Sequence, residues 1–188
     1  MRSIAKILLI AGGLAAGFCW MVRRRRSRNV EPGRYADIVD SALIDASPDV
    51  VYRAVVDEHD GMTSWWAPHF TMQLREGVSY GDVGALVDNT VRVHGRFPVR
   101  FTKKTVEVEP NKTIRVEYVA GAFRGEAQWE FVGVDDGTEL SQRWRTSPAG
   151  VLRALAPLLP IGESHSDTMK VGFERLRGYV DRTLPAVP

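Results

Sequence analysis

The chain has 188 residues, of which 44% are apolar, and this is enough for one domain with a sizeable core, so a disordered chain is excluded. Its net charge of +2 conceals an asymmetry, because residues 1–28 contain seven Lys and Arg and no acid, whereas the rest contains 18 Lys and Arg against 23 Asp and Glu. The acidic body has no basic stripe interleaved with aromatic residues, so we expect no nucleic-acid partner.

Residues 4–22 predict a transmembrane helix. The uncharged run "ILLIAGGLAAGFCWMV" (7–22) spans roughly 24 Å as a helix, and about 28 Å with residues 4–6 added, which suffices for one bilayer span. An arginine cluster follows it and predicts, by the positive-inside rule, a single-pass anchor whose C-terminal domain faces the cytoplasm. These arginines are also expected to contact anionic lipid headgroups, and they are Arg23, Arg24, Arg25, Arg26 and Arg28.

Two further interpretations apply to the same segment. A cleaved secretory signal is the alternative to a retained anchor, with "AAG" (15–17) as its cleavage site. If the anchor is retained, the G-x-x-x-G spacing of Gly13 and Gly17 allows a weak homodimer, because small residues let two helices approach closely.

Residues 23–36 form a basic juxtamembrane segment and linker, and the domain is expected over residues 37–184. A strand is predicted at 37–46, followed by a helix that begins at "SPD" (47–49), where Ser47 suits the N-cap position and Pro48 the first helical position. This helix should end near "DEHDG" (57–61). A second, brief helix is predicted in "MTSWWAPHF" (62–70), stopped by Pro68.

Period-two alternation then predicts antiparallel strands at 69–75, 90–97, 98–109, 114–118, 122–132 and 139–145. The alternation changes phase around Lys103 and Lys104, as a β-bulge would cause. A long C-terminal helix follows from apolar residues at steps of three and four: Met169, Phe173, Leu176, Val180 and Leu184. The predicted fold is α+β, a curved antiparallel sheet of six to seven strands with two short helices, closed by the long helix over a cavity.

The stretches "ALIDASPDVVYRAVVD" (42–57) and "SWWAPHF" (64–70), with the strands that contain Trp129 and Trp144, resemble the SRPBCC helix-grip superfamily. That superfamily includes START lipid-transfer domains, polyketide cyclase/dehydrase-like proteins, birch-pollen allergen relatives and Hsp90-activator-like proteins. The resemblance covers residues 37–184. It implies a hydrophobic pocket between the sheet and the last helix, but it does not imply a shared catalytic set.

We therefore expect a membrane-anchored domain that binds a lipid-like or polycyclic molecule, as a carrier in preference to an enzyme. A polyketide cyclase/aromatase-like enzyme and an Hsp90-activator-like interaction module are the alternatives. Inward-facing bulky side chains and one amide are the predicted ligand contacts: Trp65, Trp66, Phe70, Met72, Tyr118, Phe123, Trp129, Phe131, Gln142, Trp144, Met169 and Phe173.

Two details refine the predicted pocket. Gly125 and Ala127 have small side chains, which should leave room for the cavity beside Trp129. Gln142 points inward in phase with Leu140 and Trp144, so its amide should bond either a neighbour such as the Tyr118 hydroxyl or a polar group of the ligand.

No catalytic residue, metal site or cofactor is predicted. "ESHSD" (163–167) contains His165 between two acids, but cap chemistry for the last helix explains it more simply than metal binding or a triad. His94 is expected to face solvent. Residues 149–162 are almost uncharged, and they form either a kinked lead-in to the last helix that covers the pocket or a mobile lid that touches the membrane.

Overall fold

The computed structural model describes residues 36–75, 77–93 and 97–183. The predicted anchor, the arginine cluster, the glycine pair and His94 lie outside these residues. Among the helices that are described, none is both long and apolar enough to cross a membrane.

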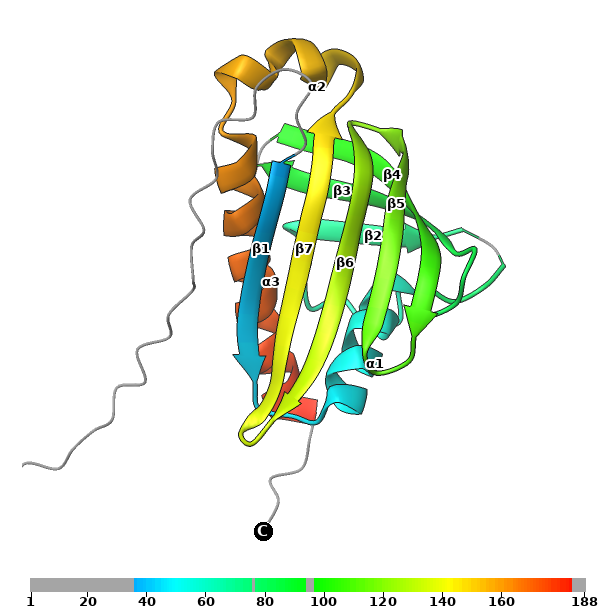
Figure 1. Ribbon diagram of the computed structural model, residues 1–188, viewed down its shortest axis with the longest axis vertical. Coiled ribbons are helices and arrows are strands. Elements are labelled where there is room, and N and C mark those ends of the chain that lie inside the picture. The colour runs from blue at the N-terminus through cyan, green and yellow to red at the C-terminus, as the bar shows by residue number, and fades with distance from the viewer. Residues whose placement is uncertain (1–35, 76, 94–96, 184–188) are drawn as a thin grey trace, which may run out of the picture.

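Seven strands form one antiparallel sheet with the order β1-β7-β6-β5-β4-β3-β2 (Figure 1). The first strand of the domain thus pairs with the last one, and each remaining pair joins neighbours in sequence. The strands are β1 (Ala36–Ile44), β2 (Phe70–Leu74), β3 (Leu86–Val93), β4 (Phe97–Glu109), β5 (Thr113–Gly121), β6 (Phe123–Val134) and β7 (Gly137–Pro148).

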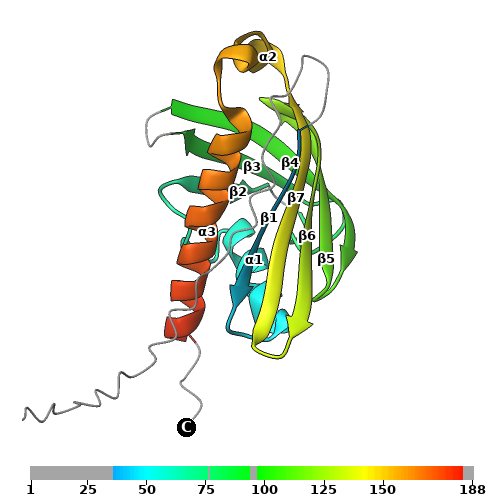
Figure 2. The same cartoon turned by 60° about the vertical axis from the view of Figure 1, so that its left-hand side comes forward.

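The helices gather on one side of this curved sheet, as Figure 2 shows. The long helix α3 (Ile161–Thr183) runs along the sheet, with α1 (Pro48–His59) near one end and α2 (Gly150–Leu155) with the 3-10 turn η1 (Ala156–Leu158) at the other. The predicted stripe Met169, Phe173, Leu176 and Val180 is buried, because it faces the sheet. The predicted helix-grip architecture of the domain is therefore confirmed.

The predicted brief helix at 62–70 is wrong. Residues 65–69 form turns instead, because the backbone N–H groups of Trp65 and Trp66 both donate to the Glu58 carboxylate, at 2.9 Å each, and Pro68 has no N–H. The second short helix is α2, which lies within the segment 149–162. Pro157 and Pro160 fall beyond its last residue, so they end it without preventing it.

The predicted strand at 90–97 is also wrong in its bounds. β3 begins at Leu86 and ends at Val93, and Phe97 opens β4 opposite it in a hairpin. The alternation in the sequence runs unbroken from Val93 to Phe97, so it concealed the change of strand direction between β3 and β4. By contrast, the predicted bulge is confirmed, since the pairing of β4 with β5 shifts between Thr102 and Lys103 and again between Thr105 and Glu107.

Candidate functional site

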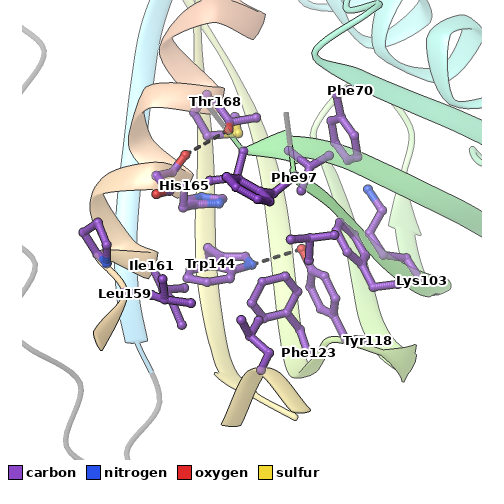
Figure 3. Close-up of a pocket in the computed structure, with 18 of the residues that line it drawn as sticks. Phe70, Phe97, Lys103, Tyr118, Phe123, Trp144, Leu159, Ile161, His165 and Thr168 are labelled. Atoms are coloured by element: carbon purple, nitrogen blue, oxygen red, sulfur yellow. Dashed lines mark hydrogen bonds between the residues drawn. The ribbon is translucent and has the colours of Figure 1, made fainter. Parts of the chain in front are cut away.

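A cavity of about 430 Å³ opens between the sheet and the N-terminal half of α3 (Figure 3). Strands β2 to β7 form its wall, and α2, Leu159, Pro160 and the first turns of α3 cover it. Its lining is mostly aliphatic and aromatic, with a few polar side chains among them: Lys103, Tyr118, Gln142, Ser164, His165 and Thr168. An apolar cavity with few converging polar groups is the usual form of a small-molecule site.

Six of the twelve predicted contacts line this cavity, namely Phe70, Tyr118, Phe123, Gln142, Trp144 and Met169. The other six do not line it, and they are Trp65, Trp66, Met72, Trp129, Phe131 and Phe173. Five of these are buried in the core, and Met72 packs against it. A role in ligand binding stays a prediction for all twelve.

The predicted room beside Trp129 is filled. The ring of Trp129 lies 6.4 Å from each of the rings of His59, Trp66 and Phe173, and Ala127 is 1% exposed. β6 instead contributes Phe123, its first residue, to the cavity. Ala127 is therefore buried in the core, and neither it nor Gly125 lines this cavity.

The Tyr118 hydroxyl accepts a hydrogen bond from Trp144 Nε1 at 3.1 Å, and this bond crosses the cavity wall from β7 to β5. Burial raises the pKa of Tyr118, so its hydroxyl stays protonated and can still donate. The Gln142 side chain lines the same wall, and its amide makes no hydrogen bond to another described residue. The predicted bond from the Gln142 amide to the Tyr118 hydroxyl is therefore not formed, and a bond to a ligand stays a prediction.

His165 projects from α3 into the cavity, one turn inside the helix, and does not cap it. Its imidazole stacks on Trp144 with ring centroids 4.3 Å apart, and its Nε2 lies 3.5 Å from Asp40 Oδ2. Burial lowers the pKa of His165 to about 3, and the positive charge of Lys103 adds to this effect. The ring is therefore neutral at physiological pH, and its contact with the Asp40 carboxylate is not an ion pair.

Lys103 is the one lysine in the lining of this cavity, and it is only 3% exposed. Its Nζ lies 3.2 Å from His59 Nε2 and within 6 Å of two aromatic rings, at 5.4 Å from the centroid of Phe70 and 5.6 Å from that of Tyr80. Burial lowers the pKa of Lys103 to about 7. Near neutral pH the amine is therefore divided between its charged and neutral forms.

His59 fixes the direction of its bond with Lys103. The His59 Nδ1 lies 2.8 Å from the Val55 carbonyl oxygen, which can only accept, so Nδ1 holds the proton of the neutral ring. Burial holds the pKa of His59 well below its usual value, with the charge of Lys103 as a second cause. Nε2 is thus an unprotonated acceptor, and Lys103 is the donor.

His59 and Lys103 were missed at the sequence level, and His165 was assigned to cap chemistry, although each of the three continues an apolar pattern. His59 lies four residues beyond Val55 on the buried face of α1, and His165 lies four residues before Met169 on α3. Lys103 lies two residues beyond Phe101 in its inward phase. The sequence signal that could have identified them is an ionisable residue at a position where the pattern expects an apolar one. For Lys103 this signal was obscured, because the alternation changes phase at the bulge.

No group of three or more His, Cys, Asp or Glu side chains suited to a metal ion occurs in the described part of the chain. The polar groups of the cavity lining are one amine, one phenol, one amide, one neutral imidazole and the hydroxyls of Ser164 and Thr168, set in apolar surroundings.

A single sheet gripped by one long helix, with a cavity between them, defines the SRPBCC class. The chain belongs to the family described as polyketide cyclase / dehydrase and lipid transport, whose model matches residues 35–180. A search of curated proteins found no match.

Solved structures agree with this class. The aromatase/cyclase Zhui from Streptomyces sp. R1128 is similar with a TM-score of 0.65 and 13% identity, over 81% of this chain and 97% of that one. A START superfamily protein from Mycobacterium smegmatis gives 0.60 and 15%, over 79% and 99%. The protein TTHA0849 from Thermus thermophilus gives 0.62 and 18%, also over 79% and 99%. At these identities the likeness establishes the fold alone.

Proposed function

We propose that this chain binds a hydrophobic small molecule, lipid-like or polycyclic, in the cavity beneath α3, and that it does so at a membrane to which residues 4–22 attach it. The observation that carries the binding proposal is the cavity itself, about 430 Å³ of space lined largely by apolar side chains. Empty apolar space of this size costs packing energy, which a bound apolar molecule would recover. The family, which takes in lipid transport, is consistent with this role.

Exposed apolar side chains beside the cavity support delivery from a membrane. Three lining residues and two neighbours from α2 and η1 form the patch that we call the mouth: Phe97, Leu155 and Leu159, with Val151 and Leu158. Val151 and Leu158 are 80% and 81% exposed, although both are aliphatic. Such a patch is unfavourable in water and favourable against a lipid surface, so it suits an apolar ligand that enters without crossing water.

The orientation of the domain relative to the membrane is part of the same proposal. With five arginines after the apolar run, the domain would face the cytoplasm, and the arginines would hold the mouth near anionic headgroups. Protease accessibility of the C-terminal domain in sealed inside-out and right-side-out vesicles tests this. Cleavage only in inside-out vesicles is expected, whereas cleavage only in right-side-out vesicles, or a shortened N-terminus consistent with signal removal, would contradict it.

The test of binding is native mass spectrometry of the purified full-length chain, followed by organic extraction of its passenger. A stoichiometric apolar compound is expected. A chain that emerges empty and takes up neither phospholipid nor polycyclic aromatic probes would refute the proposal.

The mouth has its own test. Val151→Glu/Leu158→Glu should slow the uptake of a fluorescent lipid from vesicles at least tenfold, because two charges would oppose contact with the bilayer. The control is Val83→Glu, which alters an equally aliphatic, 62% exposed residue in the segment between β2 and β3. Equal uptake by all three chains would contradict delivery through the mouth.

A polyketide cyclase/aromatase-like enzyme is the second candidate, and one observation favours it. Polar groups from three elements project into the apolar cavity, namely Lys103 from β4, Gln142 from β7 and His165 from α3, and they could orient a reactive chain. The test is ring formation from a polyketide substrate. If Gln142→Leu still binds the substrate but no longer forms the ring, the result would support an enzyme over a carrier. The Hsp90-activator-like interaction module stays an alternative, to be tested by chaperone binding.

A further inference from the structure

A buried amine stands at the inner wall of the cavity, and no residue that the structure describes gives it an acidic partner. Lys103 extends from β4, and among the described residues its Nζ has one hydrogen-bond partner, the neutral His59 ring, at 3.2 Å. Across the described ranges 36–75, 77–93 and 97–183, Lys103 takes part in no ion pair. Buried ammonium groups ordinarily have a carboxylate or comparable anion beside them, because an unpaired charge in an apolar interior is costly.

The groups that surround Lys103 offer no substitute for that anion. His59 from α1 presents an acceptor lone pair, while Tyr80 from the β2–β3 segment and Phe70 from β2 present aromatic rings. Tyr118 from β5 and His165 from α3 are the other titratable groups of the cavity, and burial keeps both uncharged at neutral pH.

Two buried acids lie in the neighbourhood, and each is directed elsewhere. Glu58, next to His59, accepts hydrogen bonds from the backbone of Trp65 and Trp66 and from the Thr63 hydroxyl. Asp40 from β1 does not line the cavity, and its carboxylate is the one that lies 3.5 Å from His165 Nε2. Neither forms a salt bridge with the amine.

We propose that Lys103 binds a carboxylate of the cavity's ligand, so that the ligand is an apolar molecule with an acid group at one end. This inference rests on the proposed function, since it names the chemistry of the molecule that the cavity would bind. His59 is a positioning residue in this arrangement, because its lone pair holds one ammonium N–H and leaves the other two for the ligand. The rings of Phe70 and Tyr80 support the ammonium from the side.

The carboxylate would reverse the effect of burial on the amine. Without ligand, the neutral amine predominates above pH 7, whereas an adjacent anion favours the ammonium form. Binding should therefore take up a proton at alkaline pH, and the affinity for an acid should fall with rising pH. A neutral ligand of the same shape should show neither effect.

The experiment is isothermal titration calorimetry of the purified full-length chain with naphthoate and with naphthamide, its uncharged counterpart. The expected result at pH 6 is that naphthoate binds at least tenfold more tightly than naphthamide. Above pH 7 this preference should shrink by about tenfold per pH unit, and titrations in two buffers of different ionisation enthalpy should show uptake of close to one proton per naphthoate at pH 8.

Two variants make the result specific. Lys103→Met keeps the length of the side chain and removes the charge, so it should fold and lose the preference for naphthoate over naphthamide. Lys104→Met alters the exposed neighbour and should behave as the unaltered chain. Equal affinities for the two compounds, or a preference that survives in Lys103→Met, would overturn this inference and leave the proposed function standing. Failure of both compounds to bind would contradict the proposed function together with the inference.

Discussion

Gly172 on α3 lies directly against the indole of Trp66, so close that a Cβ at position 172 would overlap the six-membered ring. Trp66 is 1% exposed and stacks on Trp65, with ring centroids 5.3 Å apart. The absent side chain at 172 is therefore what lets α3 approach the turn that follows α1. Because α3 also covers the cavity, this contact helps to set the depth of the site.

Gly172→Ala should destabilise the domain by about 2 kcal/mol, because the overlap falls on a rigid ring and forces α3 or Trp66 to move. The control is Gly178→Ala in the same helix, where a Cβ would meet only the flexible end of Arg182. That control should be neutral or stabilise by up to about 1 kcal/mol, since Ala favours helix. Urea unfolding of both variants is the measurement, and equal stabilities would show that the close approach has no energetic role.

Glu58→Gln should cost about 2 kcal/mol. The buried carboxylate accepts from two backbone N–H groups and from the Thr63 hydroxyl, and an amide offers only one oxygen for these three donors. Glu139→Gln, on an exposed position of β7, should change the free energy of unfolding by less than about 0.5 kcal/mol. A loss at position 58 no larger than that at 139 would mean that the turn at 65–69 does not depend on the carboxylate.

Tyr118→Phe should cost about 1–3 kcal/mol, because it leaves the buried Trp144 Nε1 without its acceptor. A double-mutant cycle with Trp144→Phe separates this bond from the packing of either ring, and a coupling energy of about 1 kcal/mol is expected. A coupling near zero would contradict the hydrogen bond as a link between β5 and β7.

Lys103 should make the stability of the domain depend on pH. Burial lowers its pKa from 10.5 in the unfolded chain to about 7, so between these values the unfolded chain binds the additional proton and folding is favoured as pH rises. The expected gain is about 1.4 kcal/mol per pH unit from pH 7 to pH 9.5 in the absence of ligand. Lys103→Met should lack this gain and be the more stable chain at pH 7, whereas Lys104→Met should retain it. Parallel slopes for all three chains would contradict a buried, neutral amine.

The parts of the fold that were predictable are those with an uninterrupted pattern. The alternation of β6 and β7 and the stripe from Met169 to Val180 identified the sheet and the covering helix, because each has one buried face over many residues. The β3–β4 reversal was not predictable in this way, since Val93 and Phe97 continue one phase across the turn. The turn at 65–69 depends on a carboxylate seven and eight residues earlier, which local pattern does not reveal.

The site was predictable only in part, for a related reason. The alternation of a strand identifies which side chains face inward. It does not show whether an inward-facing side chain lines the cavity or packs in the core. Phe123 and Trp129 share a face of β6, yet only Phe123 lines the cavity, because Trp66 and Phe173 fill the space at Trp129. Packing of α1, the turn after it and α3 makes that distinction, and it is a tertiary property.

The measurement that tests the central claim most directly is a titration of the full-length chain with N-phenyl-1-naphthylamine, an uncharged probe whose fluorescence rises in apolar surroundings. Ser164→Trp places a large ring inside the cavity, and Lys170→Trp places the same ring on the exposed side of the same helix. Saturable binding by the unaltered chain and by Lys170→Trp is expected, with at least a tenfold loss of affinity in Ser164→Trp and similar unfolding curves for all three. Undiminished binding in Ser164→Trp, or no saturable binding by any chain, would contradict a ligand site beneath α3.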